Sequence, residues 1–307
     1  MRKSCLVLLF SLICSVVCGQ QQYDNKIYKS QIELRHDNDF FLLTDRYYSS
    51  GLYLNYRTVL EQGFTNGGHE QFEFQLSQEI FTPSQTQSTN IAEFDRSYAG
   101  YIGLLSKWSA GFEDHLLEIG ISAGLVGPSS GAGGFQRWYH NTLVISDSPI
   151  WVNELKNSFH TNIYASYLKE WKLAPNPFGV RMAIKPNIAV GSRDIFLETE
   201  GLMQFGRRNI LGSTIAYNRL GSNSREIFFT LRFAYRKVFY NGLIEGNLFG
   251  DNSEVLRELK TDLYRLGFDF NHRFDGNDYK FGVRFNTAES VGSKSHKYIQ
   301  LAYGFGF

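Results

Sequence analysis

The last residues of the chain, HKYIQLAYGFGF (His296–Phe307), decide the fold. Every second residue back from the terminus is aromatic or aliphatic, namely Phe307, Phe305, Tyr303, Leu301 and Ile299. The residues between them are glycine, alanine or glutamine, so this segment is predicted to be a β-strand with one apolar face. A final strand that ends on an aromatic residue is typical of outer-membrane barrels. The alternative is the edge strand of a soluble protein, where such a strand would promote aggregation.

The beginning of the chain predicts export. Residues 1–19 combine a basic start, an apolar middle (Cys5–Val17) and a small residue, Gly19, before the expected cleavage site. This pattern predicts a secretory signal peptide, which leaves residues 20–307 as a single domain. A membrane anchor is disfavoured because the apolar run is shorter than the roughly 20 residues that span a bilayer. A lipoprotein signal ending at Cys18 is a further alternative, although Val17 is poorly suited to precede it.

Amino-acid composition further limits which class of exported protein this chain can be. All three cysteines precede residue 20, so the exported domain is predicted to have no disulfide. Aromatic residues make up 16% of the chain, yet the mean hydropathy is only −0.27. Strands that alternate apolar and polar residues give this combination, as in a membrane barrel. The formal net charge is +1, which gives no indication of nucleic-acid binding.

Alternating segments recur along the whole chain and predict an all-β, transmembrane antiparallel barrel. They lie near residues 28–36, 48–59, 70–80, 97–108, 115–125, 161–173, 180–190, 196–205, 210–218, 226–235, 238–248, 263–272, 280–287 and 298–307. A single-chain bacterial barrel has an even number of strands, and we expect twelve in the wall. One or two of the weaker segments, of which those between 196 and 218 are the weakest, are then merged or placed in loops. A short helix or ordered loop is expected near 129–155.

Strand parity brings distant polar residues together. If the chain starts and ends on the periplasmic side, the first, third and fifth connections face outward, and they are the long ones. The first connection, Asp37–Tyr47, contains Asn38 and Asp39 and is followed by Ser49, and the fifth, Gly127–His160, contains His140. These four residues are therefore expected on one outer rim.

The same residues carry a resemblance to the lipid A 3'-O-deacylase family of Gram-negative outer membranes. The matching motifs are NDF and TDRYYSSGL at the first hairpin, DRSYAGY at Asp95–Tyr101 and GPSSGAGGFQRWYH at Gly127–His140, in that order. The resemblance implies a twelve-stranded outer-membrane barrel that removes an ester-linked acyl chain from lipid A and depends on a divalent cation, usually Ca²⁺.

The resemblance also assigns roles to residues. It implies that His140 is the catalytic histidine, that Asn38 and Asp39 are the family's Asn-Asp pair and that Ser49 is its hydroxyl residue. The family has an acidic residue shortly after the histidine, for which this chain offers Asp147 or Glu154.

These residue types suit metal-assisted ester hydrolysis. Histidine titrates near neutral pH and can take a proton from water or a hydroxyl. Ca²⁺ prefers oxygen ligands, so Asp39 is the candidate metal ligand. Asn38 can donate a hydrogen bond to the developing oxyanion. We favour water activated by His140, with Ser49 as nucleophile the alternative. A channel or adhesin without chemistry, and a barrel that hydrolyses phospholipids, are the competing functions.

Overall fold

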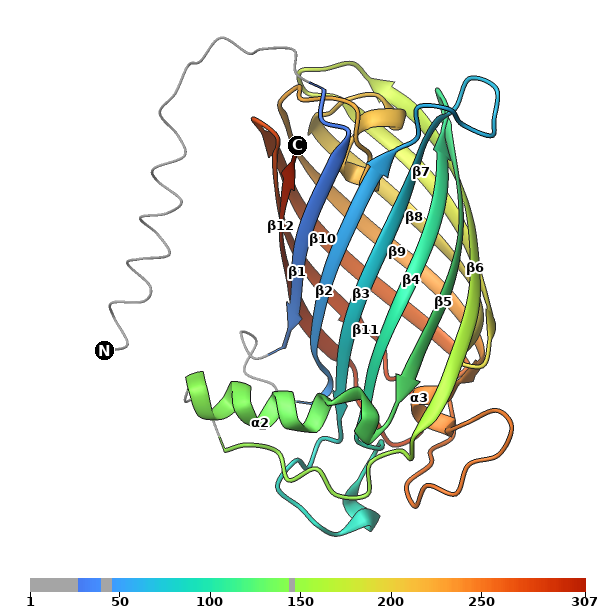
Figure 1. The fold of residues 1–307 in the computed structure, drawn as a ribbon, viewed down its shortest axis with the longest axis vertical. Helices are drawn as coiled ribbons and strands as arrows, with labels where there is room; N and C mark the ends of the chain where they lie inside the picture. The colour runs from blue at the N-terminus through green and yellow to red at the C-terminus, as the bar shows by residue number, and fades with distance from the viewer. Residues whose placement is uncertain (1–26, 40–45, 144–146) are drawn as a thin grey trace.

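The computed structural model describes residues 27–39, 46–143 and 147–307, and these form a closed antiparallel barrel of twelve strands (Figure 1). Each strand pairs with its neighbours in sequence, and β1 pairs with β12 to close the barrel. The strands are β1 (Ser30–Asn38), β2 (Tyr47–Val59), β3 (His69–Thr82), β4 (Ala99–Gly111), β5 (His115–Val126), β6 (Ser158–Ala174), β7 (Val180–Gly191), β8 (Asp194–Arg207), β9 (Glu226–Asn241), β10 (Asp262–Phe274), β11 (Asn277–Asn286) and β12 (His296–Gly306). The predicted all-β barrel of twelve strands is therefore confirmed.

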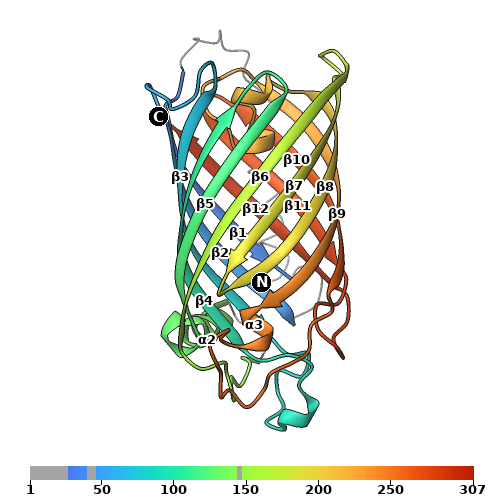
Figure 2. The same cartoon turned by 90° about the vertical axis from the view of Figure 1, so that its right-hand side faces the viewer.

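The two ends of the barrel differ. β1 begins and β12 finishes at one end, which we call the terminal end. The other, the helix end, carries the helices α2 (Ala132–Leu143) and α3 (Gly242–Glu245) (Figures 1 and 2). The short helix expected near 129–155 is thus present as α2. Among the described residues, no helix has the length and apolar character needed to cross a bilayer. The predicted signal peptide, residues 1–19, lies outside the described residues.

The structure also shows which predicted segments leave the wall. The segments near 226–235 and 238–248 merge into β9, which is followed by α3. The segment near 210–218, one of the weakest, lies in a connection, as expected for one or two such segments, and forms two short 3-10 helices, Leu211–Ser213 and Ile215–Tyr217. Leu211 and Tyr217 pack inside the terminal end against Leu116, Leu168 and Leu202. Burial in this plug, rather than in a strand face, accounts for the apolar residues that suggested a strand.

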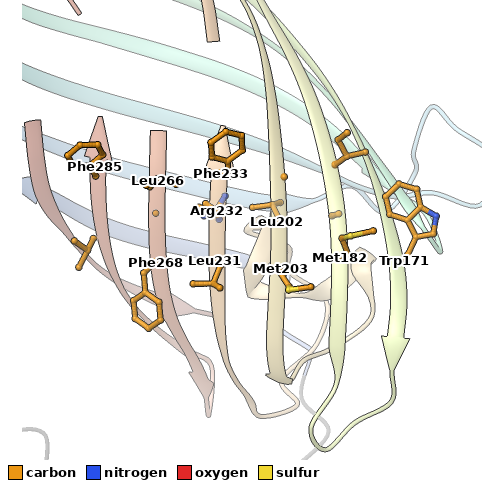
Figure 3. A pocket seen from close by; sticks show the side chains of 15 residues that line it. Trp171, Met182, Leu202, Met203, Leu231, Arg232, Phe233, Leu266, Phe268 and Phe285 are labelled. Carbon is orange, nitrogen blue, oxygen red and sulfur yellow. The ribbon is translucent and has the colours of Figure 1, made fainter. Parts of the chain in front are cut away.

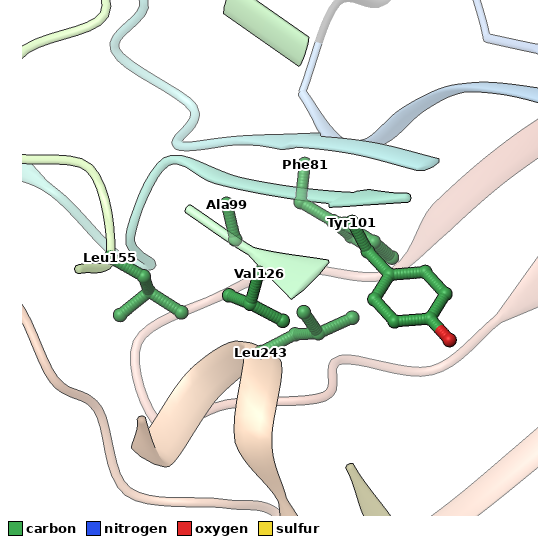
Figure 4. Close-up of a cluster of buried hydrophobic side chains, with 6 residues drawn as sticks. All are labelled: Phe81, Ala99, Tyr101, Val126, Leu155 and Leu243. Carbon is green, nitrogen blue, oxygen red and sulfur yellow. The ribbon is translucent and has the colours of Figure 1, made fainter. Parts of the chain in front are cut away.

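Side chains alternate across the wall as the sequence indicates. In β2, Leu54 and Tyr56 are exposed on the exterior face, whereas Asn55 and Arg57 are buried in the interior. Aromatic and aliphatic residues from β6 to β11 form a similar exterior face, with a shallow hollow beside Gly201 (Figure 3). At the helix end, Phe81, Ala99, Tyr101, Val126, Leu155 and Leu243 form a buried cluster that joins α3 to the wall (Figure 4).

Ion pairs fill much of the interior. Arg57 contacts Glu33 at 3.0 Å and also Glu73, and all three side chains are almost fully buried. Lys280 contacts Glu33 at 2.5 Å, and Lys107 contacts Glu73 at 3.1 Å. Each carboxylate is therefore shared between two cations. Removing Arg57 would leave Glu33 and Glu73 buried, each with only one of its two cations.

We predict that Arg57→Met lowers the free energy of unfolding by about 3–5 kcal/mol, because two buried carboxylates, Glu33 and Glu73, each lose one of their two cations. Denaturant unfolding of the refolded protein in detergent, followed by tryptophan fluorescence, measures this change. The control is Lys29→Ala, since the Lys29–Glu61 pair is exposed and contributes little. Equal midpoints for Arg57→Met and Lys29→Ala would contradict the prediction.

Candidate active site between the helix and the barrel wall

Helix α2 lies on the exterior face of the wall at the helix end, where it crosses the ends of the first strands (Figure 1). Gly100 of β4 lies directly beneath the start of the helix. A Cβ at this position would come within 2.1 Å of Ser130 Oγ and 2.3 Å of Ala132 Cβ. Gln78 of β3 donates a hydrogen bond to the backbone oxygen of Ser130 at 2.9 Å. The segment 130–132 is thus fixed to β3 and β4.

Three cross-strand rows on β1–β4 define the surface beneath the helix. The row farthest from the helix is uniform and exposed, at 51, 48, 48 and 53% for Leu34, Leu54, Leu76 and Leu104. The middle row is half-buried and consists of His36, Leu52, Gln78 and Ile102. The row nearest the helix end is buried and consists of Asn38, Ser50, Ile80 and Gly100. Exterior positions can be buried only by something outside the wall, and α2 and its flanking segments supply this cover.

One face of α2 contacts this covered row. Ala132, Gln136 and His140 are spaced by four residues, so they lie on one side of the helix, and all three are buried. Gln136 donates a hydrogen bond to Ser49 Oγ at 3.2 Å. His140, one turn later, therefore lies on the side of α2 that faces β2. The opposite side exposes Trp138, which packs against Phe135.

A β-bulge in β2 presents Ser49 to the helix. Tyr48 pairs with Phe81 and Ser50 pairs with Ile80, so Ser49 is an extra residue with no partner position on β3. A bulge of this kind redirects a side chain and is frequent beside active sites. The backbone oxygen of Ser49 accepts a hydrogen bond from the N–H of Asp39 at 3.3 Å. The first hairpin therefore holds Ser49 next to the Asn38–Asp39 pair.

Asn38 and Asp39 are both buried at the end of β1. Asn38 pairs with Ser50 and shares the exterior, covered row. Asp39 Oδ2 accepts a hydrogen bond from the backbone N–H of Arg46 at 3.0 Å. The structure thus brings Asn38, Asp39 and Ser49 together, with Gln136 linking them to the helix of His140. The roles assigned to these four residues remain predictions.

The two candidate acids lie in different places. Asp147 is exposed, and its backbone oxygen accepts a hydrogen bond from Gln87 at 3.4 Å. Glu154 is half-buried beside Gly100, and burial raises the pKa of its carboxyl to about 7. Its Oε1 is buried without a hydrogen-bond partner in the described part of the chain. Glu154 is therefore near the start of α2, two turns before His140, and the structure does not single out either residue as the supporting acid.

Two residues that contribute to the candidate site, Gln136 and Trp151, were not predicted from the sequence. Gln136 links Ser49 to Trp151, whose indole N–H donates to Gln136 Oε1 at 2.6 Å. The four-residue spacing of Gln136 and His140 is a signal that could have identified Gln136 as a neighbour of the histidine on one helix face. The ring of Trp151 packs against Gly133 of the helix and against Tyr98.

Donor chemistry limits which metal could bind here. Among the described residues, no group of three or more His, Cys, Asp or Glu side chains is placed to hold a metal ion. Zn²⁺ usually requires three or four such ligands. Ca²⁺ instead accepts amide and backbone oxygens and water beside a single carboxylate. The oxygens of Asp39, Asn38 and Ser49 fit Ca²⁺ in kind, although Asp39 is the only carboxylate among them.

Comparisons with known proteins agree with this architecture. The family model described as outer membrane protein LpxR matches residues 5–307. The chain belongs to this family. Its fold is similar to that of LpxR from Salmonella typhimurium, with a TM-score of 0.76 at 14% identity, over 90% of this chain and 100% of that one. The lipid A deacylase resemblance drawn from the motifs is thereby confirmed, and so is an outer-membrane location.

Other solved barrels share much less with this LpxR-family chain. The β domain of the Bordetella autotransporter BrkA has a TM-score of 0.45 at 9% identity, covering 92% of this chain and 100% of its own. The KdgM porin has a TM-score of 0.41 at 8% identity, covering 90% and 99%. A search of curated proteins gave no significant match.

We predict that Gly100→Ala displaces the start of α2, because the added Cβ would overlap Ser130 and Ala132. Limited proteolysis should then cleave within 127–143 about tenfold faster than in the wild type, as expected for a locally detached segment. Gly134→Ala is the matched control, since nothing lies within 4 Å of a Cβ there. If Gly100→Ala were as resistant as Gly134→Ala, the helix would not depend on this close contact.

Proposed function

We propose that this chain is an outer-membrane hydrolase that removes the 3'-linked ester acyl chain of lipid A in the outer leaflet. Family membership supports the lipid A substrate. The observation that carries the proposal is the position of the polar cluster. Asn38, Ser49, Gln136 and His140 lie between α2 and the exterior face of the wall, the face that meets lipid in a membrane barrel. An enzyme for water-soluble substrates would not need its polar groups on that side.

The three rows on β1–β4 fit an amphipathic substrate. The exposed leucine row lies four residues, or about 13 Å along the strands, from the buried row that contains Asn38 and Ser50. A lipid whose acyl chains contact the leucines would present its ester linkage near the polar row. Leaving the chains in the bilayer avoids a cost of about 0.8 kcal/mol for every CH₂ transferred to water. Orientation of the helix end toward the outer leaflet is part of this proposal.

The interior argues against a channel. The plug formed by the β8–β9 connection fills the terminal end, where Arg219 donates to Ser109 and to the backbone of His69. Ion pairs between Arg57, Glu33 and their neighbours occupy much of the lumen. A phospholipase would use the same site in the same place, and only the identity of the hydrolysed lipid separates it from a lipid A deacylase.

In the proposed reaction, His140 acts as the general base that takes a proton from the attacking water. His140 is buried on the wall-facing side of α2, which limits access of other water to the imidazole, and Gln136 fixes the adjacent turn against Ser49. The amide of Asn38 donates to the oxygen that becomes negative, and one such donor contributes roughly 3 kcal/mol in other hydrolases. Ser49 supports this arrangement through its contacts to Gln136 and Asp39. Glu154 and Asp147 remain candidates for the residue that orients His140.

Calcium is the proposed cofactor, with Asp39 as its carboxylate ligand and oxygens of the first hairpin completing the set. When bound, Ca²⁺ would supply Lewis-acid polarisation of the ester carbonyl. Asp39 is held by Ser49 and Arg46, so its position does not depend on the ion alone.

His140→Ala is predicted to lower release of the 3'-linked chain by about 10²–10⁴-fold, the usual contribution of a general base. Mass spectrometry of lipid A incubated with the purified protein measures the loss, and heat-modifiable gel migration checks the barrel. His115→Ala, near the terminal end, should retain normal activity. Normal chain release by folded His140→Ala would refute the site, and release of phospholipid acyl chains alone would favour the phospholipase.

Chelation is predicted to abolish hydrolysis, and added Ca²⁺ should restore it. Asp39→Asn should weaken Ca²⁺ binding by about tenfold or more, since the site loses its carboxylate. Calorimetric titration with Ca²⁺ measures this directly. Asp262→Asn is the matched control, because Asp262 is an exposed carboxylate paired with Lys237 at the same end. Full activity in excess chelator would remove the ion from the mechanism.

Ser49→Ala separates the two candidate nucleophiles. If His140 activates water, the variant should retain measurable turnover, and no acyl-enzyme should accumulate in the wild type. If Ser49 is the nucleophile, its loss should be as damaging as the loss of His140, because members of a catalytic unit fail together. Mass spectrometry of the intact protein during turnover would reveal an acyl group on Ser49, and finding one would overturn the water mechanism.

A further inference from the structure

The motif DRSYAGY (Asp95–Tyr101) has no part in the proposed chemistry, yet its first residues are hydrogen-bonded to several other segments of the helix end. Asp95 accepts two hydrogen bonds, from Tyr47 Oη to its Oδ2 at 2.7 Å and from the backbone N–H of Ser84 to its Oδ1 at 2.9 Å. Arg96 is buried against Phe81 and donates to the backbone of the β9–β10 connection. These contacts fix the positions of Asp95 and Arg96, so a residue that bonds to Asp95 is also held in place.

Tyr47, which donates a hydrogen bond to Asp95, has a strained backbone conformation. Its φ of 61° lies in the left-handed region, which a residue with a Cβ disfavours. The hydroxyl donates to Asp95 and accepts from the backbone N–H of Lys294 at 2.8 Å. Residues of two different loops therefore hold the hydroxyl of Tyr47, a residue that is 4% exposed. We call this pair of hydrogen bonds the clamp. Strained residues persist where the surroundings over-determine them, and they cluster at functional sites.

The clamp lies immediately before the bulge of β2. Tyr47 pairs with Thr82 and Tyr48 with Phe81, and the register shifts at the next residue, Ser49. A one-residue slip of this register would turn the strand's side chains to the opposite face. Ser49 would then lose its contact with Gln136 on α2. The conformation of Tyr47 is therefore coupled to the direction in which Ser49 points.

Resting on the proposed function, we propose that Tyr47 and Asp95 are positioning residues, whose hydrogen bond holds the bulge that presents Ser49 to α2. Neither residue needs to touch the substrate. Their influence on hydrolysis passes through Ser49, which separates this role from a general contribution to stability. The DRSYAGY motif is thereby linked to the reaction although it lies in another loop.

Tyr47→Phe tests the clamp, because it removes only the hydroxyl. We expect kcat to fall about tenfold with KM within about twofold, the signature of an interaction that matters in the transition state. The kcat of Asp95→Asn should fall to a similar extent. The kcat of the double variant should be no lower than that of Tyr47→Phe alone, since the two residues act as one unit. Tyr235→Phe is the control, as its hydroxyl also donates to an aspartate, Asp262, at 2.6 Å, in an exposed pair distant from Ser49.

The Ser49→Ala background distinguishes positioning from stability. If Tyr47 acts through Ser49, adding Tyr47→Phe to Ser49→Ala should change kcat by less than about twofold, because the coupled residue is already absent. An equally large loss in that background would overturn the proposal, as would a kcat for Tyr47→Phe equal to that of Tyr235→Phe.

A second measurement does not require deacylase activity. The native cysteines all precede residue 20, so Ser49→Cys introduces the only thiol of the predicted mature domain. Ser49 is buried, and release of the bulge by Tyr47→Phe should raise the rate of thiol modification at residue 49 by about fivefold or more, as local opening exposes the group. An unchanged rate would overturn the positioning role even if the wild type released no acyl chain, whereas a raised rate in an inactive wild type would leave it standing and refute only the proposed function.

Discussion

Closure of the barrel through β1 and β12 is the constraint on which the rest of the structure depends. Their pairing runs from Gln31 with Gly306 to Asn38 with Ile299, so the backbone groups of both terminal strands are satisfied. In a hydrocarbon environment an unpaired strand edge would be prohibitively costly. Antiparallel pairing of consecutive strands around the closed wall also places the first and fifth connections at one end. The meeting of the Asn38–Asp39 hairpin with the helix of His140 follows from this topology.

The position of α2 places the candidate site on the exterior face of the wall. A barrel rim is normally a set of loops around a lumen, but α2 lies on the exterior face, where its start packs on Gly100 and its Gln136 bonds to Ser49. Burying polar side chains on that face is costly unless they are hydrogen-bonded. Gln136, Ser49 and Trp151 provide such bonds. The polar cluster is thus kept at the boundary between the bilayer-facing wall and the helix, where an ester of a membrane lipid can reach it.

The sequence predicted the barrel well because strand alternation and an even strand count are strong constraints. The sequence could not decide in advance which weak segment leaves the wall, because at 210–218 burial in the plug imitates the alternation of a strand. It also predicted the proximity of Asn38, Asp39, Ser49 and His140 through parity and family motifs. The bulge at Ser49 and the roles of Gln136 and Tyr47 depend on cross-strand register and on contacts between distant loops, which no local pattern encodes.

The central claim is that α2 lies on the bilayer-facing side of the wall, and the environment of Trp138 tests it most directly. A nitroxide attached to Trp138→Cys in reconstituted bilayers reports access to oxygen, which concentrates in lipid, and to a water-soluble nickel complex. Leu104→Cys on the leucine row and Asn252→Cys in the β9–β10 connection provide the lipid and water references. We expect the label at 138 to be protected from nickel and accessible to oxygen, close to the lipid reference. Nickel access equal to that at 252 would place the helix over the aqueous mouth and contradict a site that meets its substrate from the membrane.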